Sequence, residues 1–170
     1  EEKFASRASV STDKILFLAK KTEWCDQAVQ FLKERWGENM VVVQGEVSDP
    51  FPKELYNWQG EIIISFLSPW IIPKAVLDLA TKVAMNFHPA PPEYPGTGCY
   101  NFALYEDAKQ YGVTCHQMKE KVDTGDIIAT KYFPVVQEES VYSLKEKSMQ
   151  ALLDLFKEIV NILAVDQPLP

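Results

Sequence analysis

Residues 14–43 have the sequence KILFLAKKTEWCDQAVQFLKERWGENMVVV, in which two short apolar runs flank a helical pattern. The runs at 14–19 and 40–43 have the length and composition of buried strands. Between them, Thr22 is a suitable cap for a helix over 23–36, whose apolar side chains recur on one stripe. The stretch therefore predicts a β–α–β unit, in which a helix connects two parallel strands.

The remaining sequence continues this alternation. Further strands are predicted at 62–66, 83–88, 113–118 and 127–136, and short helices at 73–80 and 100–106. Ser143 and Glu146 have the spacing of a capping box, which predicts that a long amphipathic helix starts there. Its inward-facing residues are predicted to be Leu144, Leu152, Leu155, Phe156, Ile159 and Leu163. Apolar early strands alternating with helices predict an α/β fold, a Rossmann-like, open, mainly parallel twisted sheet with helices on both faces.

Length and charge narrow the class of protein. The 170 residues fit one domain, predicted at 13–170, and the polar residues 1–12 are expected to form a disordered lead. A net charge of −7 disfavours binding to nucleic acid or to anionic membranes. No apolar run approaches the roughly 20 residues of a membrane span. We expect a single soluble domain whose long final helix has enough apolar surface to pair in a homodimer.

Cysteine usage and the absence of targeting signals indicate the compartment. The chain has 3 cysteines, an odd number, without a Cys-x-x-Cys motif, and no signal peptide is visible. Reduced thiols in the cytoplasm are the simplest interpretation.

The carboxyl ends of the predicted parallel strands direct attention to the site, because open α/β sheets bind ligands there. No Gly-x-Gly-x-x-Gly or P-loop follows the first strand, so neither a nicotinamide dehydrogenase nor a P-loop enzyme is expected. Asn86 and His88 lie two residues apart at a strand end and face the same side. Such an amide can stabilise an oxyanion while the imidazole accepts or donates a proton. The alternative is that His88 has a purely structural role.

Three further groups of residues border this predicted crevice. Asp123 lies in a predicted turn. Its carboxylate either hydrogen-bonds the backbone of that turn, as aspartates commonly do, or orients an imidazole. Lys20 and Lys21 precede a helix N-terminus, a position that suits the binding of an anion. The alternative interpretation is that they are solvated surface lysines. Aromatic residues there either stack on a flat heterocycle or pack a lid, and they are Trp70, Tyr94 and Tyr100. No metal is expected, because the two histidines and Asp123 lack ligand spacing.

Three segments in a fixed order resemble the folate-dependent formyltransferase family. They are NFHPAPPEYPG at 86–96, GVTCH at 112–116 and VDTGDII at 122–128. The upstream FLSPWIIP at 66–73 is similar to the family's folate-site loop, and the resemblance extends over residues 14–163. It implies transfer of a formyl group from 10-formyltetrahydrofolate to an amine, with Asn86, His88 and Asp123 as the catalytic residues.

The resemblance also implies two binding regions. The folate is expected to contact Pro69, Trp70, Ile71, Ile72, Val76, Leu77, Ala84, His116, Met118 and Val122. The amine acceptor is expected to contact Lys20, Lys21, Tyr94, Gly96 and Tyr100.

The acceptor is expected to be a nucleotide-linked amino-deoxysugar, which would place the enzyme in surface polysaccharide biosynthesis. The turn after His88 is similar to that of sugar N-formyltransferases. Transfer RNA is disfavoured by the acidic charge and by the lack of a separate carboxyl-terminal domain after the last helix. A phosphoribosylglycinamide formyltransferase is the main alternative, although its glycine- and serine-rich loop is replaced here by AKKTEW at 19–24. A formyltetrahydrofolate hydrolase and a non-catalytic folate- or nucleotide-binding module remain open.

Overall fold

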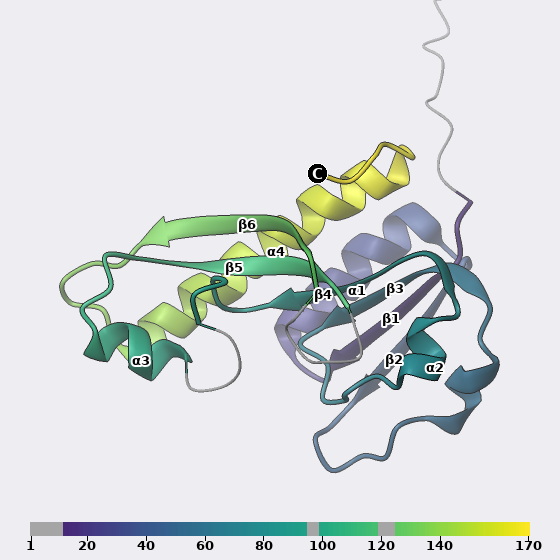
Figure 1. The fold of residues 1–170 in the computed structure, drawn as a ribbon, viewed down its shortest axis with the longest axis horizontal. Helices are drawn as coiled ribbons and strands as arrows, with labels where there is room; N and C mark the ends of the chain where they lie inside the picture. The colour runs from purple at the N-terminus through teal and green to yellow at the C-terminus, as the bar shows by residue number, and fades with distance from the viewer. Residues whose placement is uncertain (1–11, 95–98, 119–124) are drawn as a thin grey trace, which may run out of the picture.

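The computed structural model describes residues 12–94, 99–118 and 125–170, and it contains one six-stranded sheet (Figure 1). The strands are β1 (Ile15–Lys20), β2 (Met40–Gly45), β3 (Gly60–Phe66), β4 (Ala80–His88), β5 (Gln110–Gln117) and β6 (Ile127–Pro134). The helices are α1 (Glu23–Trp36), the 3-10 helix η1 (Lys53–Asn57), α2 (Lys74–Leu77), α3 (Cys99–Tyr105) and α4 (Val141–Ala164). The expected disordered lead falls largely on residues 1–11, outside the described residues.

The sheet is open and has the strand order β2-β1-β3-β4-β5-β6. Strands β2, β1, β3 and β4 run parallel to one another, whereas β5 is antiparallel to both β4 and β6. The β5–β6 pair projects beyond the parallel strands toward α3 (Figure 1). The predicted mainly parallel α/β sheet is therefore confirmed.

Helices cover both faces of the sheet, as predicted. Alternate residues of β1 point to opposite sides, so Phe17 joins one core cluster and Leu18 joins another. The first cluster lies under α1 and α4, and four phenylalanines pack at its centre with ring centroids 5.2–6.2 Å apart. The second cluster lies under η1 and α2. No helix among the described residues is long and apolar enough to cross a membrane.

Helix α4 buries every residue that the sequence analysis placed on its inner side. Leu152 and Phe156, for example, have no exposed surface and pack into the first core cluster. The helix contacts α1 and strands β4 to β6 of its own chain. This apolar stripe is therefore used within the chain, and the possible homodimer stays a prediction.

Two helices begin or end two or more residues from their predicted bounds. The helix expected at 73–80 is a single turn, because Pro73 precedes it as the cap and Ala80 already starts β4. The long helix expected to open at Ser143 begins instead at Val141, with Ser140 as its cap. The reason is that two serines have the required spacing, and the Oγ atoms of Ser140 and Ser143 accept each other's backbone N–H at 3.1 and 2.9 Å.

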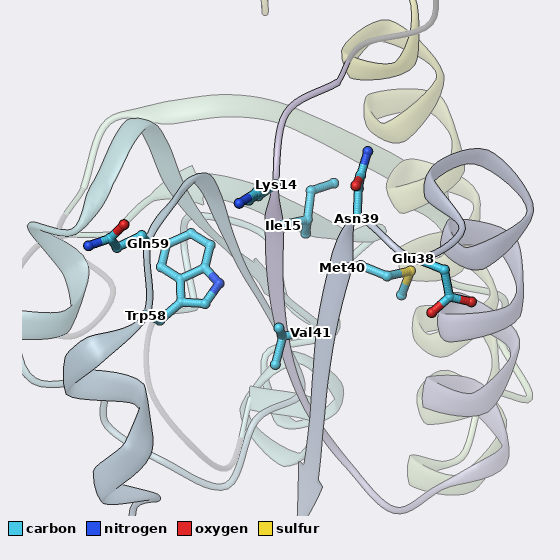
Figure 2. Close-up of a pocket in the computed structure, with 8 residues that line it drawn as sticks. All are labelled: Lys14, Ile15, Glu38, Asn39, Met40, Val41, Trp58 and Gln59. Atoms are coloured by element: carbon cyan, nitrogen blue, oxygen red, sulfur yellow. The ribbon is translucent and has the colours of Figure 1, made fainter.

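A pocket of about 280 Å³ lies at the amino ends of β1, β2 and β3, on the edge opposite the predicted crevice (Figure 2). Its lining residues are Lys14, Ile15, Glu38, Asn39, Met40, Val41, Trp58 and Gln59. None of them is a predicted site residue. This pocket therefore does not mark the chemistry that the sequence predicts.

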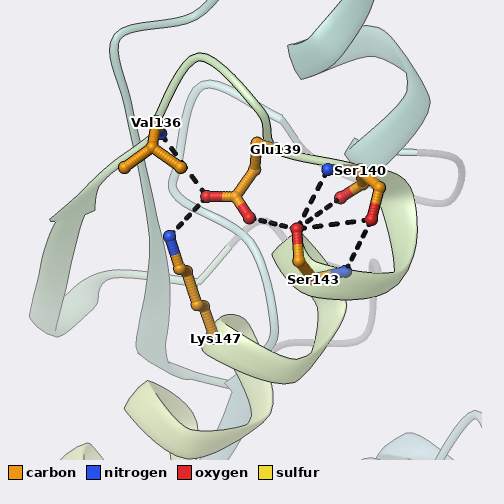
Figure 3. A network of polar contacts seen from close by, with 5 residues as sticks. All are labelled: Val136, Glu139, Ser140, Ser143 and Lys147. Atoms are coloured by element: carbon orange, nitrogen blue, oxygen red, sulfur yellow. Dashed lines mark hydrogen bonds and ion pairs between the residues drawn. The ribbon is translucent and has the colours of Figure 1, made fainter.

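A polar network fixes the start of α4 (Figure 3). The Glu139 carboxylate, whose side chain is 2% exposed, accepts hydrogen bonds from Ser143 Oγ, Lys147 Nζ and the backbone N–H of Val136. Burial alone would raise the pKa of Glu139. The bonds from Lys147 and Ser143 outweigh that effect and lower its pKa below the usual glutamate range.

We expect this network to make stability depend on pH. Because the folded-state pKa of Glu139 is lowered, its contribution is present above the unfolded value of about 4.3 and is lost as the pH falls through the folded value. Glu139→Gln should lower the free energy of unfolding by about 1 kcal/mol at pH 7, measured by urea denaturation. The difference from the wild type should shrink below about pH 4. A constant difference between pH 3 and 7 would contradict the assignment.

Candidate active site

The carboxyl ends of β1, β3 and β4 lie side by side at one edge of the sheet. The register places Ala19 beside Phe66 and Phe66 beside Phe87, and these three residues face α1 and α4. Residues one position away therefore face the opposite side. Lys20, Asn86 and His88 consequently share one face, with Lys20 two strands, or roughly 10 Å, from β4.

Asn86 and His88 meet polar residues of β5 on this face. The antiparallel register pairs Asn86 with His116 and His88 with Thr114, so all four side chains point to the same side. Asn86 Nδ2 lies 3.4 Å from His116 Nε2. His116 is buried, whereas Asn86 and His88 are half-buried and therefore partly accessible to a ligand.

Backbone carbonyls contact both imidazoles. His88 Nε2 lies 3.3 Å from the carbonyl oxygen of Tyr94, and His116 Nδ1 lies 3.0 Å from that of Gln117. Thr114 Oγ donates a hydrogen bond of 2.8 Å to the carbonyl of Ala90, which ties the turn after β4 to β5. The turn thus holds one ring nitrogen of His88 in a fixed place.

An apolar cluster adjoins these polar residues on the same face. It contains most of the residues predicted for the folate slot, namely Ile72, Val76 and Leu77, with Trp70, Ala84 and Met118 at its border. The backbone N–H of Met118 donates to the carbonyl of Ala84 at 2.8 Å, which joins the residue after β5 to the middle of β4. Ile71 is not part of the cluster and is 74% exposed, and Pro69 is half-buried.

The loop after β3 is held in a strained conformation. Leu67 has a φ angle of 52°, which costs a leucine about 1–2 kcal/mol. The Trp70 indole that follows donates to the carbonyl of Asp49 at 3.0 Å and lies so close to Gly45 that a side chain there would clash. Trp70 therefore anchors this loop to the end of β2 by packing.

Two predicted acceptor residues point elsewhere. Tyr94 packs on Tyr111, its hydroxyl donates to Glu106 at 2.8 Å, and this bond raises its pKa. Tyr100 also packs on Tyr111, with ring centroids 5.6 Å apart, and burial raises its pKa to about 12. The structure therefore places both rings in a cluster beneath α3, and only the Tyr94 carbonyl contacts His88.

Other predicted residues are placed only in part. Lys20 is half-buried at the end of β1 and Lys21 is exposed, and their contact with an acceptor stays a prediction. Asp123, Val122 and Gly96 lie outside the described residues. Over the ranges 12–94, 99–118 and 125–170, no group of three His, Cys, Asp or Glu side chains could hold a metal ion.

Two contacts of this site were not predicted. The contact of Asn86 with His116 follows from the antiparallel pairing of β4 and β5, which the sequence pattern alone does not show. The contact of His88 with the Tyr94 carbonyl involves a backbone oxygen, which carries no sequence signal.

The buried Tyr111 hydroxyl provides a stability prediction. Among the described residues it makes no hydrogen bond of good geometry, the Cys99 thiol being the nearby weak polar group, and burial is the main cause that raises its pKa. Because an unsatisfied buried hydroxyl is costly, Tyr111→Phe should raise the free energy of unfolding by about 1 kcal/mol in urea denaturation. The control is Tyr132→Phe, whose exposed hydroxyl bonds Glu93 at 2.9 Å, with an expected change within about 0.5 kcal/mol. Destabilisation by Tyr111→Phe would show that the hydroxyl has a partner.

Comparisons with known proteins agree with this fold. The methionyl-tRNA formyltransferase of Hydrogenobaculum sp. (strain Y04AAS1) is 32% identical over 110 residues, which cover 64% of this chain and 36% of that protein. The chain thus spans little more than a third of that relative's length.

Two solved structures share the fold at low identity. An N-formyltransferase from Helicobacter canadensis, in complex with folinic acid and dTDP-3-aminofucose, superposes with a TM-score of 0.75 at 16% identity, covering 91% of this chain and 67% of that one. The phosphoribosylglycinamide formyltransferase of Anaplasma phagocytophilum has a TM-score of 0.73 at 19% identity, with coverage of 90% and 87%.

A family match covers most of the chain. Residues 13–159 match the family described as Formyl transferase. This range includes all six described strands and the polar residues on β4 and β5. The chain therefore belongs to the formyl transferase family.

Proposed function

We propose that this protein transfers a formyl group from 10-formyltetrahydrofolate to the amine of a nucleotide-linked amino-deoxysugar. The observation that carries the proposal is the convergence of Asn86, His88 and His116 on one face, beside an apolar cluster at the carboxyl edge of the sheet. An amide, an imidazole and an adjoining apolar surface suit acyl transfer from a flat, partly apolar donor.

The chemistry assigns a role to each polar group. The acceptor's amine attacks the formyl carbon, and the carbonyl oxygen becomes an oxyanion that Asn86 stabilises through an amide N–H. His88 takes the proton that the amine loses and returns it to N10 of the folate as the C–N10 bond breaks. Asp123, assigned by the resemblance of the segment VDTGD at 122–126, stabilises the imidazolium by its negative charge.

The apolar cluster offers the folate an adjoining surface. Ala84, on the strand of Asn86, and Met118, directly after the strand of His116, border this cluster, so a pterin lying there would bring N10 toward the polar groups. Trp70 contributes by packing the loop rather than by stacking on the ligand, since its indole is already held against Gly45.

Two features favour a sugar nucleotide as the acceptor. Lys20 and Lys21 lie at the carboxyl end of β1, on the edge that carries His88, where they can meet a diphosphate. The net charge of −7 makes a polyanionic RNA a poor partner for this domain. The fold neighbour from Helicobacter canadensis supports the same class, since it was solved with dTDP-3-aminofucose.

The experiment supplies 10-formyltetrahydrofolate with one acceptor at a time and measures the release of tetrahydrofolate and the formylated product. The acceptors are a panel of nucleotide-linked aminosugars, phosphoribosylglycinamide and methionyl-tRNA, with water alone as the control. Formylation of an aminosugar nucleotide is the expected result. Preference for either other acceptor would overturn the sugar assignment, and release at the full rate without any acceptor would indicate a hydrolase.

A further inference from the structure

Two histidines of the candidate site contact backbone carbonyl oxygens through different ring nitrogens. Since a carbonyl oxygen has lone pairs and no hydrogen, the nitrogen that contacts it must carry the proton. We infer that His88 is protonated on Nε2 and His116 on Nδ1, so that only Nδ1 of His88 is the base of the site. This inference rests on the proposed function for its chemical meaning, but the tautomers can be measured without it.

Tyr94 holds the carbonyl that determines the His88 tautomer. Its backbone N–H donates to the carbonyl of Pro91 at 3.0 Å, and its hydroxyl donates to Glu106 at 2.8 Å. The Cys99 thiol donates to the same carbonyl oxygen at 3.0 Å. The backbone N–H and the hydroxyl of Tyr94 are both hydrogen-bonded, and its ring packs on Tyr111. These contacts fix the orientation of its carbonyl toward His88 Nε2. Tyr94 is therefore a positioning residue for His88.

The second imidazole uses its nitrogens in the opposite way. His116 Nδ1 lies 3.0 Å from the Gln117 carbonyl and is the donor of that bond. Nε2 then has a lone pair, which accepts a hydrogen bond from Asn86 Nδ2 at 3.4 Å. The lone pair of His116 is thus occupied by the amide, and the bond fixes which end of the Asn86 amide faces β5.

In this arrangement His88 transfers the proton and His116 positions Asn86. Nδ1 of His88 has no bonded partner among the described residues, so its lone pair can accept the proton that the amine loses as its nitrogen bonds to the formyl carbon. The same proton passes to N10 of the folate when the C–N10 bond breaks, and His88 is neutral again. In this sequence of steps His116 positions Asn86.

Nitrogen NMR tests the assignment directly, because the chain has only 2 histidines. Two-bond ¹H–¹⁵N correlation of the ¹⁵N-labelled protein at about pH 8.5, where imidazoles are generally neutral, distinguishes protonated from unprotonated ring nitrogens. The His116→Gln variant identifies the His88 signals by removing the other set. We expect a protonated Nε2 in His88 and a protonated Nδ1 in wild-type His116. A protonated Nδ1 or an averaged tautomer signal in His88 would overturn the inference.

A pair of tyrosine variants tests the role of Tyr94. Tyr94→Phe removes the bond to Glu106, and the matched control Tyr105→Phe changes a side chain that is 90% exposed. In Tyr94→Phe we expect the ¹⁵N chemical shifts of the two His88 ring nitrogens to move toward the average of the two tautomers. We also expect kcat to fall roughly tenfold, with KM for the folate unchanged. Tyr105→Phe should leave the His88 chemical shifts and kcat unchanged. A lower kcat with the His88 tautomer intact would contradict positioning through His88.

The two proposals can fail separately. If no acceptor is formylated but the tautomers are as inferred, the proposed function fails and the assignment of protons stands. If formyl transfer is measured and His88 is protonated on Nδ1, the function stands and the inference fails.

Discussion

Replacement of His88 by alanine is expected to lower the kcat of formyl transfer at least ~100-fold while the protein stays folded. The variant removes the ring whose Nδ1 accepts the proton of the attacking amine. Without it, the proton must pass to bulk water, which is a weaker base. The side chain is half-buried at a strand end, outside the core clusters, so little packing is lost. The rate of tetrahydrofolate release and the thermal unfolding midpoint check the two parts of this expectation.

The control for His88→Ala is Thr81→Ala, at the opposite end of the same strand. Thr81 is exposed and makes one long side-chain bond of 3.4 Å to the carbonyl of Gly60. Its substitution should leave kcat unchanged. If His88→Ala retained more than a tenth of the wild-type rate, His88 would not be the base, and the proposed mechanism would lose its central step.

The local pattern was sufficient to predict most of the fold. The helix at 23–36 has the observed bounds, because its cap at Thr22, its apolar stripe and the turn after it all lie within the segment itself. The strands β1 and β3 were located because their buried residues form continuous apolar runs. The start of α4 was misplaced because Ser140 and Ser143 both fit a cap, and in the structure Ser140 is the cap while Ser143 bonds back to it.

The candidate site was harder to predict from the sequence. Asn86 and His88 could be found because a period of two and a strand end place them together. The orientations of the Tyr94 and Tyr100 rings could not, because they depend on Tyr111, which reaches them only through the packing of β5 against α3. A loop's position along the chain thus indicates which residues border a crevice, whereas side-chain packing decides which of them point into it.

Substitution of Asn86 by leucine should have an effect nearly as large as that of His88→Ala. Leucine has almost the same shape as asparagine but no N–H, so the oxyanion loses its donor and the lone pair of His116 loses its partner. We expect kcat to fall by about 100- to 1000-fold, on the scale seen when one oxyanion donor is removed, with little change in KM for the folate.

The matched control is Asn101→Leu on the exposed surface of α3, which should leave kcat unchanged. The variant Asn86→Asp adds a second test, since it keeps the shape and brings a negative charge to the place where the oxyanion forms. Asn86→Asp should therefore be no more active than Asn86→Leu. If Asn86→Asp instead kept near-normal turnover, Asn86 would act by filling space, and the oxyanion would need a donor from another part of the chain.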